Sequence, residues 1–244
     1  MKKAKLTAKY EKTVGDFVRS KYMHPLLANE PGAVLDVGAG GVPKGDVNVD
    51  LNREWWDWYK KPENPIPIPN FILADATALP FKEAVFSSVV GCDLLEHIAD
   101  DKQALSEMRR VLKLGGKAIL HTPNKDQTHI MRFTGAVTVR DKTITFGVEQ
   151  KEHKRSGYSP DELRMKLNET GFSEIAISGT FNITECLAWE WDRFIVYECL
   201  CAKKDPAIAT IFPIRGNNLA YIQRQMLNFN PESYKNLAWL TVAK

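Results

Sequence analysis

The sequence contains little cysteine, little net charge and no long apolar run. Its cysteines, Cys92, Cys186, Cys199 and Cys201, are too few and too scattered for a disulfide framework. Cys199 and Cys201 stand two apart in an expected helix, where such side chains point away from each other, so we expect no metal centre. A formal charge of +3 provides no strong field toward nucleic acid or a membrane. No segment is apolar enough for a membrane span or the core of a signal peptide, which indicates a cytoplasmic protein.

One stretch, AVLDVGAGGVPKGDVNVDL at residues 33–51, indicates a ligand site. Short aliphatic and β-branched runs predict two strands separated by a glycine turn, and Asp50 follows the second strand directly. In an open parallel sheet, ligands bind outside the carboxyl ends of the strands, so the turn and this carboxylate should face the same crevice. Glycine lets a ligand approach the backbone, and a carboxylate accepts hydrogen bonds from the vicinal hydroxyls of a ribose. The stretch therefore predicts a nucleoside site.

The spacing within this stretch argues against a dinucleotide. A dinucleotide fingerprint has a third glycine, a full helix below the pyrophosphate and an acid about 20 residues further on. Here Pro43 occupies the position of the third glycine, and so few residues separate the strands that the first helix must shrink to a turn. A helix N-terminus is dispensable when the ligand carries no phosphate. An NAD-dependent enzyme is therefore the last of the alternatives.

Four segments then occur in a familiar order: DVGAGG with NVD, ILADATALPF (72–81), VVGCDLLEHI (89–98) and RRVLKLGGKAILHTPN (109–124). Together they resemble the class I S-adenosylmethionine-dependent methyltransferases, in particular the small-molecule, type 11-like branch, over roughly half of the chain. The resemblance implies a doubly wound, Rossmann-like α/β fold whose seven-stranded sheet is mostly parallel with an antiparallel last strand. We expect residues 1–244 to form a single methyltransferase domain with a shortened first helix and helical and hairpin cap insertions.

The resemblance also implies a cofactor, S-adenosylmethionine, with S-adenosylhomocysteine as the product, and a set of residues around it. The methionine end would contact Asp36, Gly38, Ala39 and Gly40, the ribose would contact Asp50 next to Leu51, the adenine would contact Asp75 and Ala76, and Cys92, Asp93 and His97 would line the same cleft. Asp75 has an alternative role as a turn or helix-cap aspartate. Cys92 lacks the preceding proline of cysteine-dependent enzymes and is interpreted as a small lining residue. His97 could equally have a structural role, as a hydrogen-bond partner at the buried start of a helix.

The remaining segments lie outside the resemblance. Helical spacing predicts an amphipathic N-terminal helix within residues 1–30, with Phe17 on its apolar face and Arg19 on a polar face. We expect cap insertions at 125–158, with a hairpin around Arg140-Asp141-Lys142, and at 181–233, with a long helix from about Thr184 to Cys201. Trp55, Trp56, Trp58 and Tyr59 precede the prolines of residues 62–69 and are expected to pack in the core, with a ligand wall as the alternative.

Three histidines are candidates for a general base. His153 precedes the capping box of Ser159 and Glu162, His121 ends the fifth expected strand, and His129 follows it. A base with a pKa near neutrality would help to methylate a hydroxyl group. Each histidine could instead have a purely structural role, and an amine, carboxylate or carbon acceptor would need no base.

The sequence therefore predicts methyl transfer from S-adenosylmethionine to a small molecule, with a hydroxyl oxygen as the favoured acceptor atom. One alternative is a methyltransferase that acts on RNA or protein, and a basic stripe beside the cleft would favour it. The other is a non-catalytic, S-adenosylmethionine-binding partner protein, which would have an occluded acceptor side.

Overall fold

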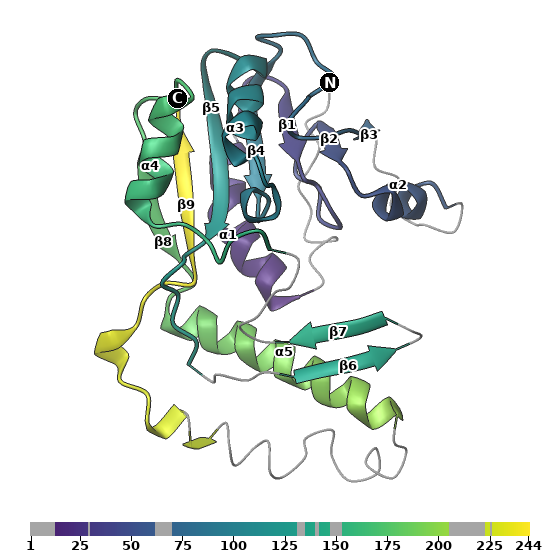
Figure 1. Ribbon diagram of the computed structural model, residues 1–244, viewed down its shortest axis with the longest axis vertical. Coiled ribbons are helices and arrows are strands. Elements are labelled where there is room, and N and C mark those ends of the chain that lie inside the picture. Colours follow the sequence, from purple (N-terminus) through teal and green to yellow (C-terminus); the bar gives the residue numbers. More distant parts are fainter. Residues whose placement is uncertain are drawn as a thin grey trace.

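The computed structural model describes residues 13–28, 30–61, 70–130, 135–139, 142–146, 153–204, 223–224 and 226–244. A seven-stranded sheet runs through the body of the protein in the order β3-β2-β1-β4-β5-β9-β8 (Figure 1). Its strands are β1 (Val34–Val37), β2 (Val47–Asp50), β3 (Phe71–Leu73), β4 (Phe86–Cys92), β5 (Leu112–Pro123), β8 (Ala176–Thr180) and β9 (Ala238–Ala243). β9 is antiparallel to both neighbours, whereas the pairs among β1 to β5 are parallel. This arrangement confirms the predicted Rossmann-like sheet with its antiparallel last strand.

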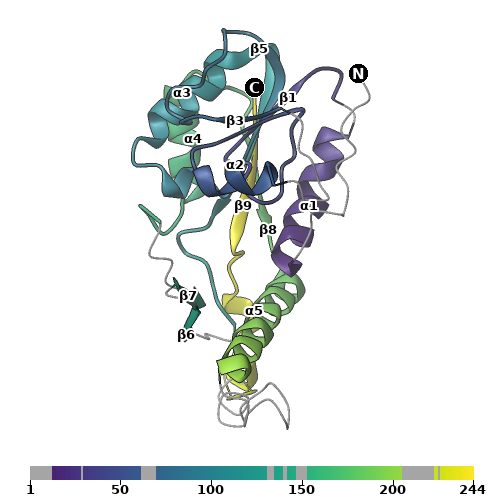
Figure 2. The same cartoon turned by 90° about the vertical axis from the view of Figure 1, so that its right-hand side faces the viewer.

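Helices cover both faces of this sheet. They are α1 (Val14–Leu27), α2 (Arg53–Tyr59), α3 (Asp101–Val111), α4 (Pro160–Glu169) and α5 (Ile183–Lys204), with short 3₁₀ helices η2 (Leu95–His97) and η3 (Pro231–Ser233). Figure 2 shows α3 and α4 on one side of the sheet and α1 on the other. Leu105 and Leu163 are fully buried in the core between the sheet and helices α3 and α4. Met23 is fully buried in a second core, on the α1 side of the sheet. Within the described ranges, none of the helices combines the length and the apolar character needed to cross a bilayer.

The connection between β1 and β2 contains no helix in residues 38–46, which confirms the predicted shortening. The chain instead folds back directly onto the strands. A Cβ atom at Gly45 would lie 2.7 Å from the backbone N of Asp36 and 2.9 Å from the carbonyl oxygen of Val34, so only glycine fits. The Val34 N–H donates to the Asp46 carboxylate at 3.0 Å. The segment that returns at Gly45 and Asp46 is therefore held against the amino-terminal part of β1.

The N-terminal helix is present over Val14–Leu27, and the part of the prediction that concerns residues 1–12 lies outside the described residues. Thr13 and Asp16 form a reciprocal capping box at its start. Two predicted orientations are wrong. Phe17 is 59% exposed, and Arg19 turns toward the sheet. The helix packs between the sheet and α5, and this packing selects a buried face that includes Val18, Met23 and Leu27.

Helix α3 ends at Val111, before the glycines Gly115 and Gly116. Asp100 caps its start and accepts from the Gln103 N–H. At the other end, the carbonyl groups of Arg110 and Val111 accept from the N–H groups of Ala84 and Val85. These hydrogen bonds supply partners for carbonyl groups of the last helical turn. The chain therefore becomes extended at Leu112, and β5 runs through both glycines.

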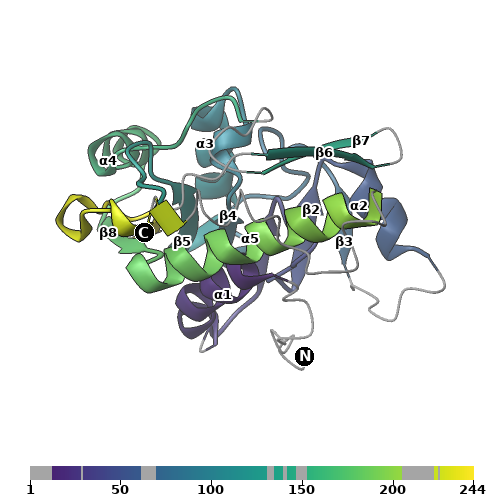
Figure 3. The same cartoon turned by 90° about the horizontal axis from the view of Figure 1, so that it is seen from below.

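The cap comprises a hairpin, β6 (Gly135–Val139) with β7 (Lys142–Phe146), and helix α5. The two strands confirm the predicted hairpin, although its turn at 140–141 lies outside the described residues, as do the prolines of 62–69 and the side chains of Cys199 and Cys201. Figures 1 and 3 show α5 and the hairpin together beyond the edge where the parallel strands end. Because α5 contacts both α1 and the hairpin, its apolar residues are distributed around most of its circumference.

Candidate active site

A cavity of about 620 Å³ opens at the carboxyl ends of β1, β2 and β4. The predicted cofactor residues that line it are Gly38, Ala39, Gly40, Asp50, Leu51, Asp75, Ala76, Cys92, Asp93 and His97. Asp36 lies below this surface and is fully buried. The structure thus gathers residues from motifs up to 60 positions apart into one cavity, of a size that is usual for small-ligand sites.

Asp50 fixes the glycine turn. Its Oδ2 accepts from the Gly40 N–H at 2.8 Å, and its Oδ1 accepts from the Asn52 N–H at 2.8 Å. Each carboxylate oxygen keeps a second lone pair, which suits a vicinal diol. The Gly38 and Ala39 N–H groups both donate to the Val49 carbonyl. A ligand therefore meets the closely packed backbone of this turn, and not a row of unengaged amide groups.

Asp36 lies under the turn. Its Oδ2 accepts from the Lys44 N–H at 2.7 Å, while its buried Oδ1 has no hydrogen-bond partner in the described part of the chain. Burial raises the pKa of Asp36 from 3.8 to about 6, although Lys44 opposes the shift. At neutral pH the folded protein therefore holds a buried, ionised carboxylate at a cost in stability.

This shift predicts a pH-dependent effect of Asp36→Asn. Between pH 4 and pH 6 the folded state binds more protons than the unfolded state, so the free energy of unfolding falls as the pH rises. The amide can still accept from Lys44 N–H but never ionises. We expect the variant to be more stable than the parent at pH 7.5, by at most about 3 kcal/mol, and nearly equal at pH 4. Urea unfolding at both pH values measures this, and an equal difference at both would contradict it.

The opposite wall of the cavity is apolar and includes a residue that was assigned to the core. Trp55 lines the cavity, and a Cβ atom at Gly41 would lie 3.0 Å from its ring. Its neighbours Trp56 and Tyr59 pack on Phe71, as expected for core residues. Leu51 is 66% exposed beside the cavity, so apolar surface is available for a base.

Asp75 forms a turn, which was the predicted alternative role, and it also lines the cavity. Its Oδ1 accepts from the N–H and the hydroxyl group of Thr77, each at 2.8 Å, which makes it a turn aspartate. The same residue lines the cavity next to Ala76. The turn thus orients the carboxylate without removing it from the cavity.

A second cavity of about 750 Å³ adjoins the first, and we call it the acceptor chamber. The two share Arg19, Asp93 and His97 in their walls. The chamber lies between the sheet and the cap, because β5, the segment at 153–156 and α5 all contribute to its lining. Sequence reasoning placed Arg19 on a polar helix face and did not predict that it would enter the site.

All three candidate bases line this chamber. His121 is fixed at both nitrogens, with Nδ1 2.6 Å from Asp93 Oδ1 and Nε2 3.0 Å from Thr180 Oγ1. His129 Nδ1 lies 3.0 Å from Glu190 Oε1. The ring of His153 packs edge-on against that of His97, with their centroids 4.5 Å apart. The structure brings these histidines together, and their roles in catalysis stay predictions.

Asp93 is the electrostatic centre of the shared wall. It bonds Arg19 Nε at 2.5 Å with one oxygen and His121 with the other. Burial opposes its ionisation, but Arg19 and His121 outweigh burial and hold the pKa of Asp93 well below its usual range. Burial also raises the pKa of Cys92 to about 12, so its thiol stays protonated and unreactive at neutral pH. This agrees with Cys92 as a lining residue.

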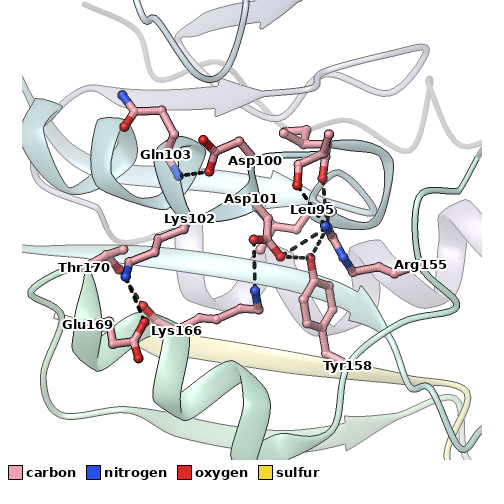
Figure 4. A network of polar contacts seen from close by, with 12 residues as sticks. Leu95, Asp100, Asp101, Lys102, Gln103, Arg155, Tyr158, Lys166, Glu169 and Thr170 are labelled. Atoms are coloured by element: carbon pink, nitrogen blue, oxygen red, sulfur yellow. Dashed lines mark hydrogen bonds and ion pairs between the residues drawn. The ribbon is translucent and has the colours of Figure 1, made fainter.

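The segment that carries His153 is fastened to η2. The Lys154 N–H donates to the Glu96 carbonyl at 2.8 Å. Arg155 donates to the carbonyl groups of Leu95 and Ile98 and lies 3.1 Å from Asp101 Oδ2. Figure 4 shows Arg155 and Tyr158 converging on the Asp101 carboxylate, which also bonds Lys166. One wall of the chamber is thus held by a buried polar network.

Gly157 allows this segment to approach the end of β5. Its φ is +138°, and a Cβ atom there would lie 2.4 Å from the Pro123 carbonyl oxygen. Gly157→Ala should therefore lower the free energy of unfolding by about 2–3 kcal/mol. Gly171→Ala is the control: φ is +86° but no atom lies within 4 Å, so only backbone strain of about 1 kcal/mol remains. Urea unfolding of both variants separates the clash from the strain, and equal losses would show that there is no clash.

Glu96 was not predicted as a site residue. Its side chain is buried in the chamber wall, and neither carboxylate oxygen has a hydrogen-bond partner within the described ranges. Burial and the neighbouring Asp93 raise the pKa of Glu96 well above its usual range. Such a group is a common sign of function.

This sheet order, with two adjoining cavities at the strand ends, is the architecture of the class I methyltransferases. Comparison with known proteins agrees with this fold. Residues 35–120 match the family model of a methyltransferase domain. The chain is 37% identical over 93 residues to a demethylmenaquinone methyltransferase of Renibacterium salmoninarum, a match that covers 36% of this chain and 39% of that protein.

Solved structures share the whole fold. A methyltransferase from Archaeoglobus fulgidus superposes with a TM-score of 0.54 at 15% identity, covering 97% of this chain and 96% of the other. One from Mesorhizobium loti has a TM-score of 0.52 at 13% identity, covering 96% and 99%. The chain spans less than two fifths of the length of the curated relatives that it matches. The comparisons therefore establish the fold and a methyltransferase-domain match over residues 35–120, and they do not identify the methyl acceptor.

Proposed function

We propose that the protein transfers a methyl group from S-adenosylmethionine to a small molecule, with a hydroxyl oxygen as the acceptor atom. The observation that carries this proposal is the wall of Arg19, Asp93 and His97 shared by the two cavities. A cofactor in the first cavity and an acceptor in the second would meet there. Alignment of the reactants is the main contribution that a protein makes to such a transfer.

The cofactor cavity fits S-adenosylmethionine in its chemistry. Asp50 presents a carboxylate at the strand tip for a ribose, and Leu51 and Trp55 present apolar surface for adenine. Bound there, the cofactor supplies a methyl group made electrophilic by its sulfonium. The acceptor oxygen would give up its proton and bond the methyl carbon, and the electron pair of the broken carbon–sulfur bond would stay on sulfur. A chamber histidine, His153, His121 or His129, would take that proton.

The acceptor chamber supports a small molecule over the alternatives. Of the four cations in its lining, Arg19 is paired with Asp93 and Arg155 with Asp101, and the other two are Lys154 and Arg193. Because two ion pairs and Glu96 lie in the same walls, these residues form no continuous basic stripe of the kind that RNA would require. A non-catalytic binding protein is expected to have an occluded acceptor side, whereas this chamber has a volume of about 750 Å³.

The test is methyl transfer to a panel of acceptors. The protein is incubated with S-adenosylmethionine and phenols, quinols, amines or carboxylates, and both S-adenosylhomocysteine and the methylated product are measured by mass spectrometry. Methylation at a hydroxyl oxygen is expected. A product methylated at carbon would show that the acceptor atom is carbon and not oxygen. Demethylmenaquinol, the type of substrate in the name of the relative from Renibacterium, is included in the panel for this reason. Transfer only to RNA or protein would show that the acceptor is not a small molecule.

A further inference from the structure

The acceptor chamber contains a three-residue group in which only His153, as a candidate base, takes a proton in the methyl transfer described above. A carboxylate oxygen of Glu96 and one ring nitrogen each of His97 and His153 lie within 4.8 Å of one another. Glu96 and His97 come from η2, and His153 comes from the segment fastened to η2 by the Lys154 N–H. The three side chains therefore converge from two parts of the chain.

The state of Glu96 indicates what this group lacks. A buried carboxylate that receives no hydrogen bond is costly, and both of its oxygens are in this state within the described part of the chain. Neither Arg19 nor Arg155 donates a hydrogen bond to it, because Arg19 bonds Asp93 and Arg155 bonds Asp101. A cation placed between Glu96 and the two histidines would supply the missing partner.

We infer that Glu96, His97 and His153 bind a divalent first-row transition-metal ion, and that this ion holds the oxygen of the methyl acceptor. Two imidazoles and one carboxylate suit zinc, manganese or iron(II) better than magnesium, which prefers oxygen ligands. Three protein ligands leave coordination positions open for a substrate, as in catalytic metal sites.

The geometry is compatible with such an ion after a small adjustment. Ligand atoms about 2.1 Å from a metal lie at most about 4.2 Å apart, and the three atoms here lie within 4.8 Å of one another. The His97 side chain is 39% exposed, so its ring has room to rotate. The other candidate trio, Cys92, Asp93 and His121, is less suitable because both Asp93 oxygens are engaged by Arg19 and His121.

This inference rests on the proposed function and changes one part of it. His97 lines both cavities, so the ion would lie where the acceptor oxygen must meet the methyl group. A divalent ion lowers the pKa of an oxygen that it binds. The metal would then activate the hydroxyl group, His153 would act as a ligand, and the proton would leave to His121, His129 or water.

Metal binding can be measured without turnover. The protein is stripped with a chelator and titrated with Zn²⁺ by calorimetry and with Co²⁺ by visible absorption. We expect one equivalent to bind, and Glu96→Gln and His153→Asn each to weaken binding by about tenfold or more. His129→Asn, a chamber histidine outside the trio, should retain the affinity of the parent for the metal.

Binding of S-adenosylhomocysteine in each variant shows that the protein is folded and the cofactor cavity intact. Zn²⁺ binding of equal strength in the parent and in Glu96→Gln would overturn the assigned ligands. Failure of the parent to bind Zn²⁺ or Co²⁺ while it binds S-adenosylhomocysteine would overturn the metal site and leave the proposed function standing. Failure to bind S-adenosylhomocysteine, with metal binding as expected, would overturn the proposed function and support the metal site.

Discussion

Replacement of Asp101 by alanine is expected to lower the free energy of unfolding by about 3–5 kcal/mol. The Asp101 side chain is 5% exposed and bonds three partners: Arg155 at 3.1 Å, Lys166 at 3.0 Å and the Tyr158 hydroxyl at 2.7 Å. Its removal leaves two cations and a buried hydroxyl group without their acceptor. Because the Arg155 and Lys166 side chains are 23% and 21% exposed, water can relieve part of the loss, and the lower end of the range is expected.

The neighbouring Asp100 provides a matched control. It is also an aspartate at the start of α3, but it only caps the helix by accepting from the Gln103 N–H at 3.0 Å. Asp100→Ala should therefore cost about 1 kcal/mol. Urea unfolding followed by circular dichroism compares the two variants. Similar losses for both variants would mean that the network around Arg155 contributes little to stability and does not hold the segment that carries His153 in place.

The second large effect concerns the cofactor. Asp50→Ala is expected to weaken the binding of S-adenosylmethionine by more than a factor of about 100, because it removes charged hydrogen bonds to the ribose hydroxyls worth about 1.5–3 kcal/mol each. It also removes the acceptor of the Gly40 N–H, which loosens the glycine turn. Both losses act on binding in the same direction, and calorimetric titration measures their sum.

Asp46→Ala controls for the loss of an aspartate beside the same strand. The Asp46 carboxylate accepts from the Val34 N–H at 3.0 Å, and Asp46 is absent from the lining of the cofactor cavity. Its replacement should leave the affinity for S-adenosylmethionine within a factor of about three, although it removes one hydrogen bond of the fold. If Asp50→Ala bound the cofactor as tightly as Asp46→Ala does, Asp50 would have no place in the ribose site.

Much of the fold could be predicted because its signals are local. Aliphatic runs that stop at glycine mark β1 and β2, and the Ser159 capping box marks α4, where the Glu162 N–H donates to Ser159 Oγ. The order of the sheet strands is not a local property. It came from the resemblance of four motifs to a known family, and the structure confirms it.

The residues of the acceptor chamber were harder to predict because their partners are distant in the sequence. Arg19 lies on a helix face that periodicity assigns to solvent, yet its partner Asp93 is 74 positions away. Glu96 is buried in η2, which is contacted by the segment around Arg155, almost 60 positions further along the chain. Trp55 belongs to an aromatic cluster in which one ring lines the cavity while its neighbours pack in the core. No pattern within a single segment distinguishes these cases.

The most direct test of the central claim is a calorimetric titration of the purified protein with S-adenosylmethionine, S-adenosylhomocysteine and NAD. The cavity has a carboxylate at the tip of β2, a glycine turn and no helix for a pyrophosphate. We predict saturable binding of both sulfur nucleosides at one site and no binding of NAD. Binding of NAD, or of none of the three, would contradict the assignment of this cavity to S-adenosylmethionine.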